Sequence, residues 1–231
     1  MKIDILQLID GAKKAEGLTV IIDVFRAFSL EAYMLDSGVE RIYPVGKTET
    51  AYAMKAENPD WILAGERHGA ILPSFDTGNA PSELYRLDLK GKTVVHTTSA
   101  GTQGVDNAKN AEEILGASLV NAKATAEYIR KSGAEKVSLV CMGLEGVEET
   151  EEDTLCARYI KGLLEGESLD MQTEIQALKY SSGAKFFDSA QATVFPEKDF
   201  YMCTELDKFP FVMRLKKDER GREYIKKEQL K

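Results

Sequence analysis

The chain has 231 residues, of which 43% are hydrophobic and 29% are charged, and its formal net charge at pH 7 is -8. This composition is typical of a globular protein, and the acidic balance argues against nucleic acid as a partner, because binding a polyanion requires clustered Lys and Arg. No apolar run is long enough to span a bilayer and the N-terminus is too acidic for a signal peptide, so we expect a cytoplasmic protein without a membrane partner.

Strand and helix patterns alternate along the first two thirds of the chain. The segment LTVIIDV at 18–24 is β-branched and apolar, which predicts a buried strand that ends at Asp23. Further strands are expected at 41–46, 61–65, 92–98, 117–121 and 136–143, with helices at 27–38, 48–58, 99–116 and 122–133. This alternation predicts an α/β fold with three layers, α/β/α, in a single domain over residues 1–231.

The predicted elements repeat in the same order. Strand centres near residues 22, 43 and 63 recur near residues 95, 119 and 139. Residues 18–66 and 92–143 therefore read as two similar strand-helix-strand-helix-strand halves of one compact unit, which would be an internal duplication. The alternative is that the alternation found in any α/β protein produces this spacing by chance.

The last third of the chain is more strongly charged. An acidic segment after Gly143 predicts a helix that begins near Thr150 and has acids in its first turn. The apolar segment KFPFVMRLK at 208–216 is either the interface of a homodimer or a strand of the chain's own core. The highly charged segment 216–231 is expected to be mobile or to lie at an edge.

Three polar loops follow predicted strands: DVFRAFS at 23–29, GERHGAILPSFDTGNAP at 65–81 and TTSAGT at 97–102. Because the carboxyl ends of parallel strands lie along one edge of a sheet, we expect the loops to line one cleft. The longest loop has no helical or alternating period, and such loops are usually functional, although its residues also suit an ordinary solvated turn. TTSAGT precedes a helix and offers hydroxyl and N–H groups to a phosphate, but it lacks the Lys of a P-loop.

Together these loops resemble the 2-phosphosulfolactate phosphatase family. The resemblance lies in DVFRA, in the GER to FDTGNAP loop, in HTTSAGT and in EEDTLCA near residue 153, and it extends weakly through TELDKFPFV at 204–212. It implies an α/β enzyme that uses Mg²⁺ to hydrolyse the phosphate ester of a sulfonated hydroxy acid, a step toward coenzyme M. The sequence departs from the family pattern at Ser74, Ala80, Ala100 and Arg158.

The residue types in these loops suit phosphoryl transfer, in which charge that builds on oxygen atoms must be stabilised. Arg26 and Arg67 are expected to clamp anions, and His68 is expected to donate a proton to the leaving group. Asp23 would be a metal ligand, a nucleophile or a general base. We expect Mg²⁺ to bind oxygen ligands on Glu66, Asp76 and Asp153. Substrate binding is assigned to Thr97, Thr98, Ser99, Gly101, Thr102 and Asn79.

Each of these assignments has a structural alternative. Asp23 would cap the following helix, and Arg26 would pair with an acid on a neighbouring loop. Glu66 would form an ion pair with Arg67, and Asp153 would be a first-turn acid favoured by the helix dipole. In these alternatives the same side chains stabilise the fold and take no part in the reaction.

Other functions were weighed against a Mg²⁺-dependent phosphatase. His96 and Cys156 are expected to be buried structural residues. A phosphatase of the haloacid-dehalogenase type is set aside, because it needs a second Asp two residues after the nucleophile, where Phe25 stands. A non-catalytic module that binds a small anion stays open, since Ala80 and Ala100 lack the polar groups of the family pattern.

Overall fold

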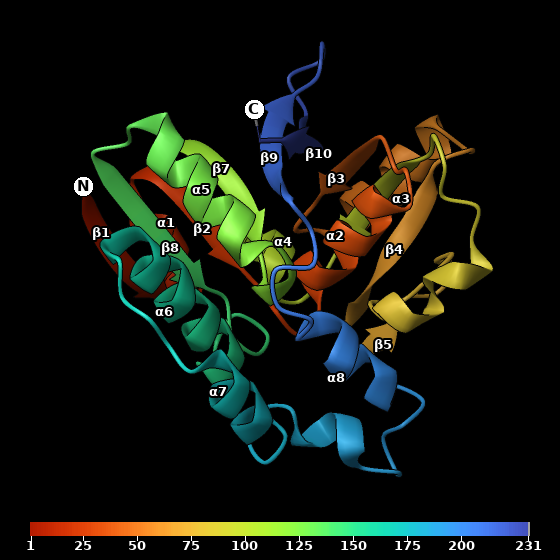
Figure 1. Ribbon diagram of the computed structural model, residues 1–231. Coiled ribbons are helices and arrows are strands. Elements are labelled where there is room, and N and C mark those ends of the chain that lie inside the picture. Colours follow the sequence, from red (N-terminus) through yellow and green to blue (C-terminus); the bar gives the residue numbers. More distant parts are fainter. Residues whose placement is uncertain (231) are drawn as a thin grey trace.

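The computed structural model describes residues 1–230, and Figure 1 shows its helices packed around one strongly curved sheet. The strands are β1 (Lys2–Gln7), β2 (Gly17–Ile22), β3 (Arg41–Pro44), β4 (Ile62–Arg67), β5 (Ala70–Ile71), β6 (Thr93–Thr97), β7 (Ala111–Ala117), β8 (Lys136–Cys141), β9 (Phe211–Lys217) and β10 (Glu223–Gln229). The α-helices are α1 (Leu8–Lys14), α2 (Ala27–Asp36), α3 (Thr48–Glu57), α4 (Gly101–Asn107), α5 (Ala122–Ser132), α6 (Glu151–Glu165), α7 (Met171–Leu178) and α8 (Glu197–Cys203). Short 3₁₀ segments are η1 (Pro81–Arg86), η2 (Leu119–Asn121) and η3 (Ala184–Phe187).

Strand β2 shows how the layers form. All six of its residues are buried, as expected for a parallel strand that is covered on both faces. Because successive side chains of a strand point to opposite faces, Ile21 packs in one core with α1, α2 and α4, whereas Val20 and Ile22 pack in another with α5 and α6. The predicted α/β class with three layers is confirmed.

The sheet contains two parallel groups separated by an antiparallel hairpin. Its strand order is β1-β8-β2-β7-β9-β10-β3-β6-β4-β5. Strands β1, β8, β2 and β7 are parallel to one another, as are β3, β6 and β4, and β9–β10 lies between the two groups. Strand β2 is inserted between β8 and β7, and β6 between β3 and β4. The segments 18–66 and 92–143 thus each place their first strand between two strands of the other, while their origin by duplication stays a prediction.

One predicted strand is misplaced. The strand expected at 117–121 lies at Ala111–Ala117, and the helix expected over 99–116 ends at Asn107. Gly116 explains part of this difference between the predicted and the observed strand. A Cβ at Gly116 would lie 2.6 Å from the Phe28 ring, so a glycine lets β7 pack closely against α2. The strand stops where the N–H of Ser118 donates to Asn121 Oδ1 at 2.9 Å and the chain turns toward α5.

Contrary to the prediction from the sequence, the described part of the C-terminal segment, residues 216–230, is not a mobile or edge element. Residues 211–217 and 223–229 form the β9–β10 hairpin in the middle of the sheet (Figure 1). Phe211, Val212 and Met213 are fully buried, so the apolar patch is part of the chain's own core and not a dimer surface. The charged residues of this segment are half-buried or exposed on a structured hairpin, which is why their composition misled.

Two findings concern the N-terminus and membranes. Strand β1 and helix α1, for which no prediction was made, extend one edge of the sheet through parallel pairing with β8. Within residues 1–230, no helix combines the length and the apolar character that crossing a bilayer requires. The cytoplasmic location stays a prediction.

Candidate active site

Residues from the three predicted loops meet at one cavity of about 290 Å³. From the predicted set, it is lined by Asp23, Arg26, Glu66, His68, Asn79 and Ser99. We expected one parallel edge of the sheet to bring these loops together. Instead, β2 belongs to one parallel group and β4 and β6 belong to the other. The curvature of the mixed sheet brings the carboxyl ends of these strands together.

Asp23 follows β2 at the start of α2. Its Oδ1 accepts a hydrogen bond of 3.1 Å from the N–H of Ala27, so it does contact the helix start as the capping alternative required. Burial, helped by the negative charge of Glu66 and opposed by the Ala27 N–H, raises the pKa of Asp23 to about 7. A carboxyl that changes protonation near neutral pH and lines a cavity is a candidate for chemistry as well as structure.

Arg26 is fully buried and held in place from α8. Its Nη1 donates to Asp199 Oδ2 at 2.9 Å and to the carbonyl oxygen of Val194 at 2.8 Å. Asp199 is itself fixed, because its Oδ1 accepts from the N–H of Ser82 at 2.9 Å. The guanidinium carbon lies 4.9 Å from the Phe195 ring centroid. Among residues 1–230, Nε and Nη2 of Arg26 have no hydrogen-bond partner, so they are available to a ligand in the cavity.

The TTSAGT turn holds protein carboxylates and not an open phosphate cradle. The N–H of Ser99 donates to Glu66 Oε1 at 2.8 Å, and the N–H of Gly69 donates to Glu66 Oε2 at 2.7 Å. Gly101 lies against Asp23, since a Cβ at Gly101 would be 2.9 Å from Asp23 Oδ2. The donors that we expected to bind substrate thus position the two acidic side chains of the cavity.

The threonines of this turn are engaged with the protein. Thr98 and Thr102 exchange hydrogen bonds, with the N–H of Thr98 donating to Thr102 Oγ1 at 2.9 Å and the N–H of Thr102 to Thr98 Oγ1 at 3.2 Å. Thr97 Oγ1 accepts from Arg67 Nη2 at 2.8 Å. None of the three threonines lines the cavity, so the structure places them in its supporting framework.

Arg67 also points away from the cavity. Its Nη2 donates to the carbonyl oxygen of Gly46 at 3.0 Å as well as to Thr97, and its Nη1 donates to the carbonyl oxygen of Glu66 at 2.7 Å. It therefore ties the ends of β3, β4 and β6 together. The guanidinium bonds to the backbone of Glu66 and not to its carboxylate, so the ion pair offered as an alternative is not formed either.

The three carboxylates expected to bind Mg²⁺ do not converge. Both oxygens of Asp153 accept backbone N–H groups at 2.8 Å, from Val24 and from Gly143. Asp76 Oδ2 accepts from the N–H of Leu63 at 2.8 Å, and the side chain lies outside the cavity. Residues 1–230 contain no group of three or more His, Cys, Asp or Glu side chains arranged to hold a metal. Of the three, only Glu66 faces the cavity.

A family comparison fits this geometry. The family model of 2-phosphosulpholactate phosphatase matches residues 3–218. The chain belongs to this family. A relative in Bacillus subtilis, named a probable 2-phosphosulfolactate phosphatase, is 33% identical over 87% of this chain and 88% of its own length. A relative of the same name in Carboxydothermus hydrogenoformans is 38% identical over 71% of this chain and 68% of its own length. The resemblance drawn from the loop motifs is confirmed.

In this member of the 2-phosphosulfolactate phosphatase family, His68 has an acidic partner. Its Nδ1 lies 2.7 Å from Glu145 Oε1, and its side chain is 78% exposed. The hydrogen bond to Glu145 and the charge of that carboxylate raise the pKa of His68. A positive φ of 53° at His68 turns the chain at the rim of the cavity. His68 thus lies at the rim of the cavity with an acidic partner, Glu145, that the sequence did not indicate.

Asn79 reaches the cavity from a buried polar chain. His96 Nε2 lies 3.3 Å from Asn79 Oδ1, and His96 Nδ1 lies 2.8 Å from Glu31 Oε1. His96 and Glu31 are both fully buried, which agrees with the structural role expected for His96. The contact with His96 fixes the amide of Asn79, leaving its Nδ2 as the side-chain donor that can face a ligand.

Sequence reasoning missed several residues of this cavity. Lys185, Gln191 and Phe195 come from the segment between α7 and α8, and Asp199 anchors Arg26 from α8. The segment has neither a strand end nor a family motif to draw attention to it. Of the positions at which the sequence departs from the family pattern, Ala100 lines the cavity. The polar group that it lacks therefore affects which ligands the cavity can bind.

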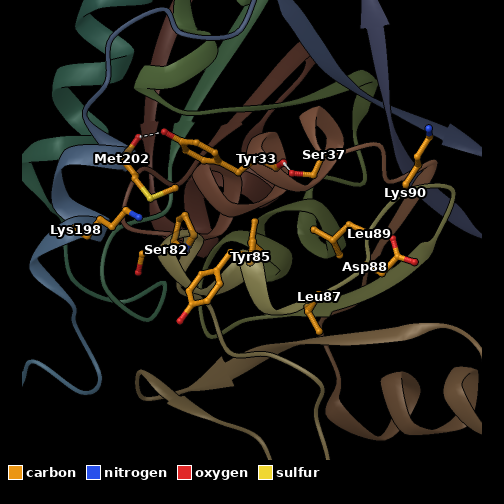
Figure 2. A pocket seen from close by; sticks show the side chains of 12 residues that line it. Tyr33, Ser37, Ser82, Tyr85, Leu87, Asp88, Leu89, Lys90, Lys198 and Met202 are labelled. Atoms are coloured by element: carbon orange, nitrogen blue, oxygen red, sulfur yellow. Dashed lines mark hydrogen bonds between the residues drawn. The ribbon is translucent and has the colours of Figure 1, made fainter.

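A second cavity, of about 450 Å³, lies between η1, α2 and α8 (Figure 2). Its Tyr33 hydroxyl donates to the carbonyl oxygen of Met202 at 3.0 Å, a bond drawn in Figure 2. Although it is larger, it contains none of the predicted site residues, and of carboxylates only Asp88. The smaller cavity carries the predicted site residues Asp23, Arg26, Glu66, His68, Asn79 and Ser99.

Proposed function

We propose that this protein is a Mg²⁺-dependent phosphatase that hydrolyses the phosphate monoester of 2-phosphosulfolactate or of a closely related phosphorylated hydroxy acid. The observation that carries the proposal is that Asp23 and Glu66 line one cavity with Arg26. Two carboxylates suit a hard cation, and a guanidinium suits a phosphate. Membership of the 2-phosphosulfolactate phosphatase family supports the same reaction class.

Asp23 and Glu66 together suit Mg²⁺ better than the predicted set of Glu66, Asp76 and Asp153. Burial and the charge of Glu66 raise the pKa of Asp23, so an ionised Asp23 is costly unless a cation compensates it. Mg²⁺ commonly takes one or two carboxylates and completes its coordination with water and substrate phosphate. We therefore assign Asp23 and Glu66 as the residues that would hold it. When bound, Mg²⁺ would neutralise charge on the phosphoryl oxygens.

The protein's own residues bind and orient the ester. Arg26, locked by Asp199, offers Nε and Nη2 to phosphate oxygens without having to reorganise. Glu145 raises the pKa of His68 and engages its Nδ1, which leaves Nε2–H to donate to the alkoxide oxygen as the ester bond breaks. Asn79 adds an amide donor whose orientation is set by His96.

Phosphate release from 2-phosphosulfolactate tests this function. The parent should be active with Mg²⁺ and inactive with a chelator, and Glu66→Gln should lose activity. Calorimetric titration with Mg²⁺ provides a second readout: affinity should fall as pH drops below about 7, because protons then compete for Asp23. A parent that binds 2-phosphosulfolactate but releases no phosphate would instead be the non-catalytic module. Full activity in the presence of a chelator would rule out a requirement for Mg²⁺.

A further inference from the structure

Lys185 differs from the other cationic residues of the cavity. Arg26 is paired with Asp199 at 2.9 Å, and His68 is paired with Glu145 at 2.7 Å. Lys185 has no ion pair and no hydrogen bond among residues 1–230, although it is half-buried and its charge is felt by Glu152. A half-buried ammonium group that has no hydrogen-bonded acid keeps N–H donors that the protein does not use. It is therefore suited to an anion supplied by a ligand.

Aromatic rings hold this ammonium group at the cavity wall. Its Nζ lies 5.3 Å from the Phe195 ring centroid, 5.8 Å from that of Phe186 and 6.0 Å from that of Phe25. Phe25 and Phe195 line the same cavity. Contacts of this kind restrict a flexible side chain and favour its charged form. Lys185 is thus placed before a ligand arrives.

Lys185 and Arg26 lie against the same ring. The guanidinium carbon of Arg26 is 4.9 Å from the Phe195 centroid, which is 5.3 Å from Lys185 Nζ. The cavity wall therefore presents two cationic groups next to one ring, one braced by Asp199 and one without a hydrogen-bonded acid. A ligand with one anionic group would use only one of them, whereas a ligand with two or more would use both.

We propose that Lys185 is a specificity-determining residue that binds a carboxylate or sulfonate of the substrate while the phosphate ester occupies the Arg26 side of the cavity. This inference rests on the proposed function and extends it. It assigns a residue of this chain to the further anion of that substrate. Esters without that anion would still reach Arg26, Asp23 and Glu66, but they would be bound less tightly.

Steady-state kinetics of Lys185→Gln on three esters tests the proposal: 2-phosphosulfolactate, 2-phospholactate, which lacks the sulfonate, and glycerol 2-phosphate, which has neither further anion. A charge-assisted contact corresponds to roughly a 10- to 100-fold change in binding. We expect KM for 2-phosphosulfolactate to rise by about that factor, with kcat and the KM for glycerol 2-phosphate unchanged. A KM for 2-phospholactate that rises equally identifies the carboxylate, and one that does not identifies the sulfonate. Lys185→Arg should restore much of the loss.

Lys179→Gln is the matched control. Lys179 lies in the same part of the chain and also contacts aromatic rings, with its Nζ 4.9 Å from the Tyr201 centroid, but it does not line the cavity. This variant should leave all three KM values unchanged. An equal loss by Lys185→Gln on glycerol 2-phosphate, or no loss on any ester, would overturn the specificity role.

Calorimetric binding of sulfolactate, which has both anions but no phosphate, separates this inference from the proposed function. The parent should bind it and Lys185→Gln should bind it more weakly by the same factor. If the parent binds sulfolactate through Lys185 yet releases no phosphate from any ester, the proposed function is wrong and the anion site stands. If the parent hydrolyses 2-phosphosulfolactate and Lys185→Gln binds sulfolactate normally, the function stands and this inference is wrong.

Discussion

Asp23 and Asp153 are both buried carboxylates beside the end of β2, but their surroundings differ. Asp153 uses both oxygens to accept backbone N–H groups, from Val24 and Gly143, and lines no cavity. Asp23 accepts from Ala27 through one oxygen and lines the cavity with Glu66. A buried carboxylate that does not line the cavity braces the loops, whereas one that lines it can take part in chemistry.

Replacement of Asp23 should have the largest effect on turnover. Asp23→Asn removes a charge that would hold the cation, and losing one such electrostatic group lowers kcat by roughly 10² to 10³. Phosphate release at saturating Mg²⁺ measures this loss. Turnover close to that of the parent would show that Asp23 only caps α2.

The same variant should be more stable than the parent at high pH. The pKa of Asp23 is raised by folding, so the ionised form destabilises the native state, and this penalty grows as pH rises from about 4 toward about 7. Urea unfolding at pH 8 should therefore favour Asp23→Asn, and the difference should vanish near pH 4. An equal loss of stability at both pH values would mean that Asp23 is a brace like Asp153.

Asp153→Ala should act on stability first. It leaves the N–H groups of Val24 and Gly143 buried without acceptors, at a cost of about 1 to 3 kcal/mol each. The free energy of unfolding, measured in urea, should fall by about 2 to 5 kcal/mol. Asp153→Asn, which keeps one acceptor, should lose less. A fully stable Asp153→Ala that lost only Mg²⁺ affinity would restore its predicted role as a ligand.

Replacement of Glu145 at the rim should have a smaller effect, confined to the pH dependence of turnover. Because Glu145 raises the pKa of His68, proton donation by His68 should persist to higher pH in the parent. Glu145→Gln should move the alkaline limb of the kcat profile to lower pH, and His68→Gln should abolish that limb. An unchanged profile in both variants would assign the proton to another group.

The smallest effect is expected at Asp76. Its contacts are the N–H of Leu63 and, at 3.5 Å, the partly exposed ammonium of Lys55, all outside the cavity. Asp76→Asn keeps an acceptor for that N–H, so kcat should stay near the parent value. A loss of turnover as large as that of Asp23→Asn would bring Asp76 back into the metal site.

The site could be predicted where a family motif follows a strand. Asp23, Arg26, Glu66 and His68 were found in this way, since β2 and β4 have strong apolar patterns. The sequence did not distinguish Arg26 from Arg67, which has the same side chain but donates to the carbonyl oxygen of Gly46. That distinction depends on which backbone groups each side chain meets in three dimensions.

Fold prediction failed where long-range contacts override the local pattern. The charged 223–229 segment forms a central strand because β9 and β3 flank it, and nothing in its composition indicates those neighbours. Asp199 and Lys185 were missed for a related reason: they meet Arg26 and Phe25 across more than half the chain, without a motif of their own.

The interleaving of the two parallel groups has a consequence for synthesis on the ribosome. Strand β2 leaves the ribosome early, but its neighbours β7 and β8 extend to Ala117 and Cys141. Until those residues emerge, the apolar LTVII stretch has no partner and is open to wrong pairing. The β9–β10 hairpin that joins the groups is made after both of them. The nascent chain therefore exposes unpaired strand edges until residue 141 has emerged from the ribosome. Binding by a chaperone is most useful before that point.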